Sequence, residues 1–266
     1  MVEKMKDVLS EIIAHKKIEV ENQKKLLSIN EIEKRINRNS FESLSLKAAL
    51  LESSHGIIAE FKRKSPSKLW INQQADATII PFEYQTNGAA ALSILTDEIY
   101  FGGTMIDLQK VVSLTSIPVL RKEFIVDEYQ IYESKMYGTH AILLIAAALT
   151  PKQCKQFTQT ALSIGLEVLL ELHDEKEIEY ISPLNNMIGV NNRNLGSFET
   201  NVEKSFKMID KLPKEAVLIS ESGISDPRTV YELRQAGYKG FLIGENFMKT
   251  DHPGKSLKQF IRGIHE

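Results

Sequence analysis

From residue 56 onward, short runs of isoleucine, valine and leucine alternate with longer stretches whose apolar residues recur at helical spacing. Eight such runs lie at 57–61, 90–95, 117–121, 140–146, 166–172, 187–191, 216–220 and 240–244. Continuous apolar strands separated by helices are typical of a parallel sheet that is covered by helices. The alternation therefore predicts an α/β fold.

Residues that favour helix ends mark the segments between these runs. Residues typical of helix N-termini occur at Asp127, at Thr150 with Pro151, and at Asp226 with Pro227. Glycines that suit the position after a helix occur at Gly138, Gly165 and Gly237, shortly before the next apolar run. These positions support helices between the strands.

Eight strand–helix units match a closed (β/α)8 TIM barrel, a fold that typically takes about 250 residues. An open doubly wound sheet is the alternative. It is disfavoured because no G-x-G-x-x-G segment follows the first run and the chain has no Walker-type phosphate loop. We therefore predict a (β/α)8 TIM barrel.

Residues 1–55 lie outside this repeat and predict additional N-terminal helices. Apolar residues recur there at helical intervals, at Met5, Val8, Leu9, Ile12 and Ile13. Shorter helices are expected around 29–36 and 46–53, and no Gly/Pro-rich linker precedes residue 56. We expect residues 1–55 to form a helical extension packed on the barrel, within a single domain of residues 1–266.

Net charge and cysteine content indicate in which cellular compartment the protein works and which classes of partner it binds. The 33 basic and 35 acidic residues give a net charge of −2, which offers no general attraction to nucleic acid or to an anionic membrane. The single cysteine, Cys154, fits a reducing compartment, and the N-terminus is too charged for a signal peptide. The longest apolar run, at 141–149, is less than half the length of a bilayer-spanning helix. We expect a cytoplasmic monomer with no nucleic-acid or membrane partner.

In a (β/α)8 barrel, catalytic groups collect where the strands end. The predicted strand ends carry charged and amide side chains, namely Glu60, Lys62, Lys122, Glu171, Asn191, Arg193 and Glu221. Glu60 and Lys62 share one face of the first strand because side chains alternate along a strand. Opposite charges that meet in a pocket offset each other's desolvation and shift each other's pKa, as an acid–base pair requires. The set predicts an inward-facing catalytic pocket.

The loops after the seventh and eighth runs, "SESGIS" and "LIGENFM", predict a phosphate site. Their glycines let backbone N–H groups approach an anion, and barrels frequently bind phosphate with these two loops. After the first run, Ser65 and Ser67 offer hydroxyl donors, and Lys62 or Lys64 offers a counter-charge. Each residue alone also has a structural interpretation, as an ion pair or a turn. Their coincidence at one face of the barrel favours a functional site.

The histidines do not indicate a metal site. They are scattered, with no pair at ligand spacing, at His15, His55, His140, His173, His252 and His265. His173 shares a strand face with Glu171, and a hydrogen-bonded structural role is the favoured interpretation. No metal is predicted.

Several longer stretches resemble one enzyme family. They are "IIAEFKRKSPSK", "GAAALSILTDEIYFGGT", "IPVLRKEFIVDEYQI", "LLIAAALT", "GLEVLLELHDEKE", "IGVNNRNL", "LISESGI" and "FLIGENFM", preceded by "LSEIIAHKKIEV". In this order they resemble indole-3-glycerol phosphate synthase, an enzyme of tryptophan biosynthesis. The resemblance implies a barrel with extra N-terminal helices. It also implies conversion of 1-(2-carboxyphenylamino)-1-deoxyribulose 5-phosphate into indole-3-glycerol phosphate, CO₂ and water, with no metal or organic cofactor.

The resemblance implies roles for residues at the strand ends. Lys122 matches the general acid that protonates the ketone oxygen of the substrate. Lys62 matches the lysine that engages the substrate carboxylate and helps to position the ring. Glu171 matches the carboxylate of the dehydration step, and Glu60 supports that network and the departing hydroxyl.

The remaining matches complete three sets of site residues. Asn191 and Glu221 join the catalytic set as further polar contacts. The substrate-binding set comprises Phe101, Phe124 and Leu143 around the aromatic ring, with the loop-ordering Arg193 and with Leu195 and Leu242. The phosphate-binding set comprises Ser65, Ser67, Ser222, Gly223, Gly244 and Glu245. Glu245 is expected to contribute its backbone N–H, because its carboxylate would repel phosphate.

Two other functions stay open at this point. Phosphoribosylanthranilate isomerase, another phosphosugar barrel, would need a cysteine base on the first strand, and Cys154 is misplaced for it. A catalytically silent phosphate-binding barrel would have no reason to keep costly buried charges. One departure from the family pattern is that Leu69 and Trp70 follow "SPSK", where glycine is usual. We expect closure of this first loop to differ and the reaction to be unchanged.

Overall fold

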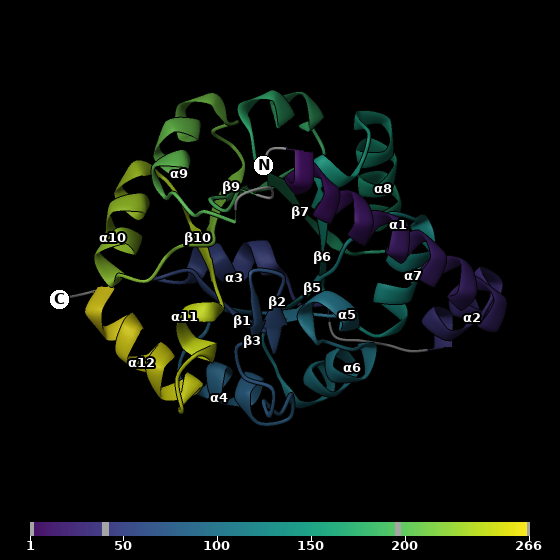
Figure 1. The fold of residues 1–266 in the computed structure, drawn as a ribbon, viewed down its shortest axis with the longest axis horizontal. Coiled ribbons are helices and arrows are strands. Elements are labelled where there is room, and N and C mark those ends of the chain that lie inside the picture. Colours follow the sequence, from purple (N-terminus) through teal and green to yellow (C-terminus); the bar gives the residue numbers. More distant parts are fainter. Residues whose placement is uncertain (1–2, 39–42, 195–197, 265–266) are drawn as a thin grey trace.

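The computed structural model describes residues 3–38, 43–194 and 198–264. Parallel strands close into a barrel in the order β1, β4, β5, β6, β7, β8, β9, β10 and back to β1 (Figure 1). The strands are β1 (Ile57–Phe61), β4 (Ala91–Leu95), β5 (Val119–Lys122), β6 (Ala141–Ile145), β7 (Glu167–Leu172), β8 (Met187–Asn191), β9 (Val217–Glu221) and β10 (Gly240–Ile243). Each predicted run forms a strand of this barrel, so the (β/α)8 fold is confirmed and the open sheet is excluded.

Helices follow the strands and surround the barrel (Figure 1). They are α4 (Ile80–Thr86), α5 (Glu98–Phe101), α6 (Met105–Leu114), α7 (Glu128–Met136), α8 (Pro151–Ser163), α9 (Glu203–Met208), α10 (Pro227–Ala236), α11 (Glu245–Met248) and α12 (Pro253–Ile264), with 3-10 turns η1 (Ala146–Ala148), η2 (Glu175–Tyr180) and η3 (Ile209–Lys211). As predicted, the side chains of Asp127, Thr150 and Asp226 accept hydrogen bonds from backbone N–H groups of the turns that follow.

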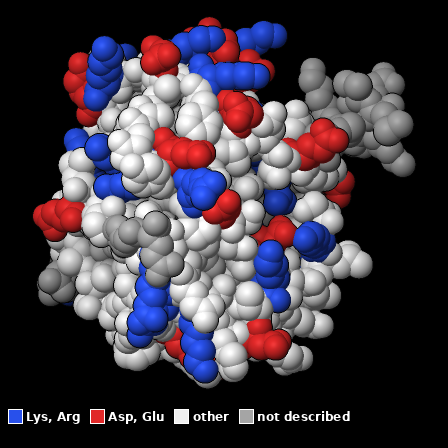
Figure 2. Space-filling view, turned by 90° about the vertical axis from the view of Figure 1, so that its left-hand side faces the viewer, with Lys and Arg blue, Asp and Glu red and all other residues white. Residues whose placement is uncertain are grey.

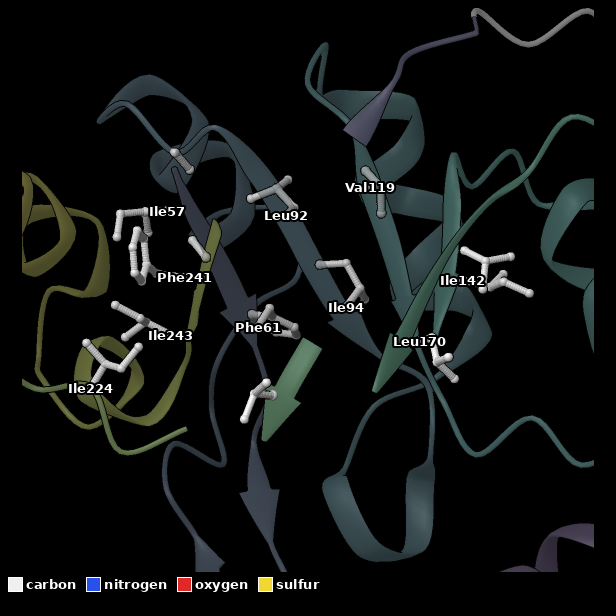
Figure 3. Close-up of a cluster of buried hydrophobic side chains, with 14 of the residues drawn as sticks. Ile57, Phe61, Leu92, Ile94, Val119, Ile142, Leu170, Ile224, Phe241 and Ile243 are labelled. Carbon is white, nitrogen blue, oxygen red and sulfur yellow. The ribbon is translucent and has the colours of Figure 1, made fainter. Parts of the chain in front are cut away.

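The side chains of each strand alternate between two buried layers. The outer layer lies between strands and helices and includes Ile57, Phe61, Leu92, Ile94, Val119, Ile142, Leu170, Phe241 and Ile243 (Figure 3). The inner layer fills the barrel and includes Ile58, Leu120, Leu143, Leu169 and Ile219. Four charged residues each lie two positions after an inner-layer residue, namely Glu60, Lys122, Glu171 and Glu221. The strand period therefore directs these charged groups into the barrel mouth.

The N-terminal helices α1 (Glu3–Leu26), α2 (Ile29–Arg38) and α3 (Leu46–Glu52) precede the barrel. At the amino-terminal end of the barrel, Leu46 and Leu50 of α3 are fully buried in the inner layer. Ile12 of α1 packs against the inner layer as well. The predicted N-terminal helices are therefore present, and α1 and α3 contact the barrel through Ile12, Leu46 and Leu50.

The molecular surface carries charges of both signs. On the face drawn in Figure 2, basic and acidic side chains are interspersed among uncharged ones. Across residues 3–38, 43–194 and 198–264, no helix has the length and apolar character that crossing a membrane demands.

Candidate active site

A cavity that is partly open to solvent lies at the carboxyl ends of the barrel strands. It collects most of the predicted site residues: Glu60, Lys62, Phe101, Lys122, Phe124, Leu143, Glu171, Asn191, Arg193, Ser222 and Leu242. These residues come from strands and loops that are far apart in the sequence. The predicted convergence of the strand ends is therefore present in the structure.

Lys122 lies at the centre of a buried carboxylate cluster. Its Nζ lies 2.8 Å from Oε2 of Glu171 and 3.2 Å from Oε2 of Glu221. Burial opposes the charge of this lysine, but Glu171, Glu221 and Glu60 together raise its pKa above the ordinary value. Lys122 is therefore an ammonium group at neutral pH.

The two glutamates that contact Lys122 have opposite pKa shifts. Burial opposes ionisation of Glu171, but the charge of Lys122 outweighs it and lowers the pKa of Glu171 to about 2. Burial raises the pKa of Glu221 well above its ordinary value, and the neighbouring Glu171 adds to that shift although Lys122 opposes it. Neighbouring carboxyl groups with pKa values pushed apart are typical of acid–base sites.

Glu60 and Lys62 form a second ion pair at the end of β1. Nζ of Lys62 lies 2.7 Å from Oε1 of Glu60, and both side chains are largely buried. Gly244 leaves room for this pair, because a Cβ at that position would lie 2.5 Å from Oε1 of Glu60. The glycine predicted for the phosphate site therefore also has a packing role.

Apolar side chains cover another part of the cavity. The rings of Phe101 and Phe124 lie 6.0 Å apart, tilted by 38°. Val8, Leu9 and Ile12 of α1 also line the cavity. Sequence reasoning assigned these three residues to a packing helix and missed their place in the site. Nothing local in the sequence indicates which end of a barrel an extension covers.

A second, more polar cavity adjoins the first and shares Glu60, Lys62 and Ser222 with it. Its lining also includes the predicted phosphate residues Gly223, Gly244 and Glu245. Ser222 and Gly223 have φ angles of 69° and 75°, a backbone conformation that a serine rarely adopts. Such strained backbone clusters at functional sites.

The polar cavity contains residues that sequence analysis missed. Thr200, Asn246 and Lys249 contribute to its lining. Lys249 lies four residues after Glu245, a spacing that puts two helical side chains on one face. That spacing is the sequence signal that could have indicated a further cation at the predicted phosphate loops.

Loop one, between β1 and α4, forms a short hairpin of β2 (Lys64–Ser65) and β3 (Lys68–Trp70). The Glu245 carboxylate lies 2.6 Å from Nζ of Lys68 and 3.4 Å from Nη2 of Arg193. Nη1 of Arg193 donates a hydrogen bond to Oγ of Ser67 at 3.0 Å. Loop one is therefore tied to the loops after β8 and β10, and the Glu245 carboxylate is neutralised by two cations.

Some predicted site residues lie apart from the two cavities. Ser65 is buried within loop one, where its Oγ accepts a hydrogen bond from the backbone N–H of Lys68 at 3.2 Å. Neither Ser65 nor Ser67 is among the described residues that line the cavities, so their phosphate role stays a prediction. Glu221 lies beneath the cavity and meets it through its contact with Lys122. Leu195 lies outside the described residues.

The cysteine is not placed for chemistry. Cys154 is fully buried on α8, in the layer between the barrel and its helices. Burial raises the pKa of its thiol to about 11, so it is protonated at neutral pH. This position does not fit the first-strand base that the isomerase alternative would require.

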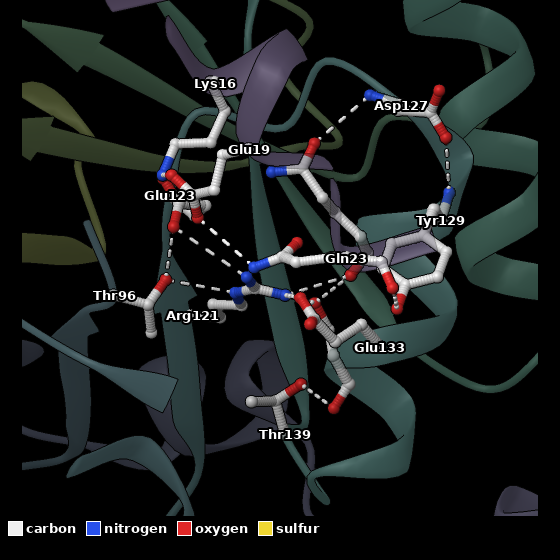
Figure 4. A network of polar contacts seen from close by, with 12 residues as sticks. Lys16, Glu19, Gln23, Thr96, Arg121, Glu123, Asp127, Tyr129, Glu133 and Thr139 are labelled. Carbon is white, nitrogen blue, oxygen red and sulfur yellow. Dashed lines mark hydrogen bonds and ion pairs between the residues drawn. The ribbon is translucent and has the colours of Figure 1, made fainter. Parts of the chain in front are cut away.

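A buried ion network joins α1 to the strand that carries Lys122 (Figure 4). Nζ of Lys16 lies 3.0 Å from Oδ2 of Asp97 and 3.2 Å from Oε1 of Glu123, and all three side chains are 1% exposed. Nη2 of Arg121 lies 3.8 Å from Oε2 of Glu123 on the other side. Because Glu123 directly follows Lys122, the network fixes α1 next to the proposed acid.

The fold is a closed parallel barrel. At its mouth an acid–base pocket adjoins a polar cavity, at the loops where barrel enzymes usually bind phosphate. Together these features define a barrel enzyme for a small phosphorylated substrate. The family model described as indole-3-glycerol phosphate synthase matches residues 9–260. The chain therefore belongs to the indole-3-glycerol phosphate synthase family, and it is a carboxy-lyase of tryptophan biosynthesis.

Relatives of known name agree with this assignment. The chain is 53% identical over 260 residues to the indole-3-glycerol phosphate synthase of Bacteroides thetaiotaomicron, covering 98% of this chain and 100% of that one. It is 40% identical over 262 residues to the enzyme of the same name from Polaromonas naphthalenivorans, covering 97% and 99%. A mutant tryptophan synthase α-subunit from Pyrococcus furiosus matches with a TM-score of 0.60 at 13% identity, covering 79% of this chain and 98% of that one. That last likeness supports the barrel fold alone.

Proposed function

We propose that the two adjoining cavities hold one extended substrate, 1-(2-carboxyphenylamino)-1-deoxyribulose 5-phosphate. Its aromatic ring lies in the apolar cavity beside Phe101 and Phe124, and its phosphate lies in the polar cavity beside Ser222 and Gly223. One observation carries the proposal. The buried Lys122 ammonium lies in a cavity that shares lining residues with the cavity at the predicted phosphate loops.

Ring closure requires an acid at the ketone, and Lys122 supplies it. The ring carbon that bears the carboxylate attacks the ketone carbon, and the ketone oxygen takes a proton from the Lys122 ammonium. The raised pKa of Lys122 still permits the transfer, because the alkoxide that forms is a far stronger base than a neutral amine. Lys62 holds the carboxylate until it leaves as CO₂, and the electron pair of the broken bond restores the aromatic ring.

Dehydration requires a base. The proton transfer from Lys122 during ring closure makes Glu171 a stronger base. The charge of Lys122 is the main influence that lowers the pKa of Glu171. Once Lys122 has lost its proton, this attraction disappears and Glu171 binds a proton more tightly. Glu171 then removes a proton from the carbon beside the ring nitrogen, while the hydroxyl takes up a proton from an active-site lysine and leaves as water.

The remaining residues stabilise charge and fix geometry. Positive charge develops on the ring during closure, and the carboxylates of Glu60 and Glu171 stabilise it electrostatically. The apolar wall keeps a flexible substrate folded so that its two reacting carbons meet. Asn191 adds a polar contact at the end of β8, and Arg193 orders the neighbouring loops through Ser67.

The direct experiment is an assay of the purified protein with the carboxyphenylamino substrate. Indole fluorescence is expected to appear, with one CO₂ released for each product molecule. A folded protein that forms no product would refute the proposal. Turnover of phosphoribosylanthranilate instead would point to the isomerase.

Ser222→Ala is expected to raise KM about five- to tenfold and to leave kcat nearly unchanged, because a lost hydrogen bond to a phosphate weakens binding without touching the reacting carbons. Inorganic phosphate should also become a weaker competitive inhibitor. Ser163→Ala, which removes an exposed hydroxyl at the end of α8, is the matched control. An unchanged KM in Ser222→Ala would count against the phosphate assignment.

Several expectations from the sequence stay proposals. The contacts of Lys16 and Ile12 with the barrel support one domain of residues 1–266. The near-neutral charge supports a protein that acts without nucleic acid, and the single cysteine supports a cytoplasmic location. We also propose a monomer that uses no metal or organic cofactor.

A further inference from the structure

The imidazole of His173 is buried beside Glu171 and makes no hydrogen bond within the described part of the chain. His173 directly follows β7 and stands two positions after Glu171, so both side chains lie on the interior face. Nε2 of His173 lies 3.2 Å from Oε1 of Glu171, and the imidazole side chain is 7% exposed. Neither ring nitrogen has a hydrogen-bond partner within the described part of the chain. The structural hydrogen bond expected from the sequence is therefore not made, and buried nitrogens without partners call for an explanation.

The surroundings of His173 keep its imidazole neutral. The charged groups that face it are Glu171 and Lys122 of the barrel and Lys204 of α9. Glu177 of η2 accepts a hydrogen bond from the backbone N–H of His173 at 2.6 Å. Burial lowers the pKa of the imidazole to about 4, in spite of the attraction of Glu171.

A neutral imidazole carries one N–H, and the geometry indicates which nitrogen holds it. If Nε2 of His173 carried a lone pair, that lone pair would face the anionic Oε1 of Glu171 and be repelled. The proton therefore belongs on Nε2, from which it can be donated to the carboxylate.

The partner that holds Glu171 in the free enzyme is needed elsewhere during the reaction. Nζ of Lys122 donates to Oε2 of Glu171 at 2.8 Å. To protonate the ketone, this ammonium has to turn toward the substrate, and after the transfer it is neutral. Glu171 therefore loses Lys122, its main hydrogen-bond partner, during ring closure. Ring closure is the step before the dehydration in which Glu171 acts as the base.

We propose that His173 is a positioning residue that takes over Glu171 at this point, its Nε2–H donating to Oε1 and holding the carboxylate for dehydration. The inference rests on the proposed role of Glu171 as the base. Catalytic hydrogen bonds that are poorly aligned in a free enzyme commonly tighten when the substrate is bound. The buried, unpaired imidazole is thus a donor held ready for the substrate complex.

Three substitutions test the proposal. H173Q places an amide N–H where Nε2 lies, H173N places it where Nδ1 lies, and H173L removes the donor. H173L and H173N are expected to lower kcat roughly ten- to a hundredfold, the effect of one hydrogen bond to a charged group, whereas H173Q retains most of kcat. KM should change little in all three variants, because the interaction acts after substrate binding.

The pH profile gives a readout that a purely structural role would not change. A hydrogen bond to the carboxylate lowers the pKa of Glu171, so losing it raises that pKa in the substrate complex. The acid limb of the kcat–pH profile is therefore expected at higher pH in H173L and H173N, and near its original position in H173Q. Wild-type kcat and profile in H173L, or equal losses in all three variants, would overturn the proposal.

Measuring the effect of H173L in the E171Q variant tests the positioning role of His173 separately from the proposed role of Glu171 as the base. If His173 acts through Glu171, H173L added to E171Q should cause little further loss of kcat. An undiminished loss in that background would refute the positioning role. Full activity of E171Q itself would instead refute the assignment of Glu171 as the base. If H173L fails to fold, the comparison of H173Q with H173N carries the test, since the two side chains match in polarity.

Discussion

Lys122→Met is expected to lower kcat at least about a hundredfold, because methionine fills a similar space but cannot donate a proton to the ketone oxygen. The substitution also leaves the buried carboxylates of Glu171 and Glu221 without their shared cation. Indole fluorescence measures turnover, and far-UV circular dichroism with urea unfolding shows whether the variant is folded. Lys155→Met, at an exposed lysine of α8, is the matched control and should keep the original kcat.

Glu171→Gln separates lost chemistry from lost stability. The amide keeps the shape of the carboxylate, and Lys122 retains Glu221 as a partner. We expect the same loss of kcat, at least about a hundredfold, since an amide cannot accept the proton of the dehydration step. Full activity in either variant would remove the role proposed for that residue.

Lys16→Met is expected to reduce the free energy of unfolding by roughly 3–5 kcal/mol, the effect of removing one partner from a buried ion pair. The pKa of Lys16 shows how strongly its charge is held: burial opposes the charge, yet Glu123 and Asp97 raise this pKa above the ordinary value. Methionine would remove the nearest cation from both almost fully buried carboxylates and leave Glu123 only Arg121, at 3.8 Å. Urea unfolding followed by circular dichroism measures the change.

Lys17→Met provides the control, because Lys17 is the next residue of the same helix and is exposed. It should change the free energy of unfolding by no more than about 0.5 kcal/mol. Adding E123Q to K16M should recover part of the loss, since it removes one of the two buried negative charges that Lys16 balances. Unfolding of K16M at the same urea concentration as K17M would show that the Lys16 network does not stabilise the fold.

The barrel could be predicted because its determinants are local. Each barrel strand, β1 and β4 to β10, corresponds to a short apolar run of the sequence. The N-caps at Asp127, Thr150 and Asp226 mark helices between these strands. Alternation along β1 also predicted correctly that Glu60 and Lys62 share the inward face. Hydrophobic period and capping chemistry act over a few residues, so the sequence displays them directly.

The site was predictable only in outline. Strand ends in a barrel must meet at one mouth, which was sufficient to bring Lys122, Glu171 and Ser222 into one cavity. The same rule says nothing about loop one, where Ser65 and Ser67 lie outside the cavity linings. Loop side chains depend on contacts with other loops, and no period in the sequence encodes those contacts.

Patterns within single segments of the chain were enough to predict the closed barrel, the inward direction of its charged strand ends and the family. Folding of the whole chain places Lys122 between Glu171 and Glu221, α1 against the apolar cavity, and Lys16 among buried carboxylates. These features could not be predicted from the sequence, because ion pairing and burial depend on distances between segments far apart in the chain. Such distances are fixed by the packing of the whole barrel.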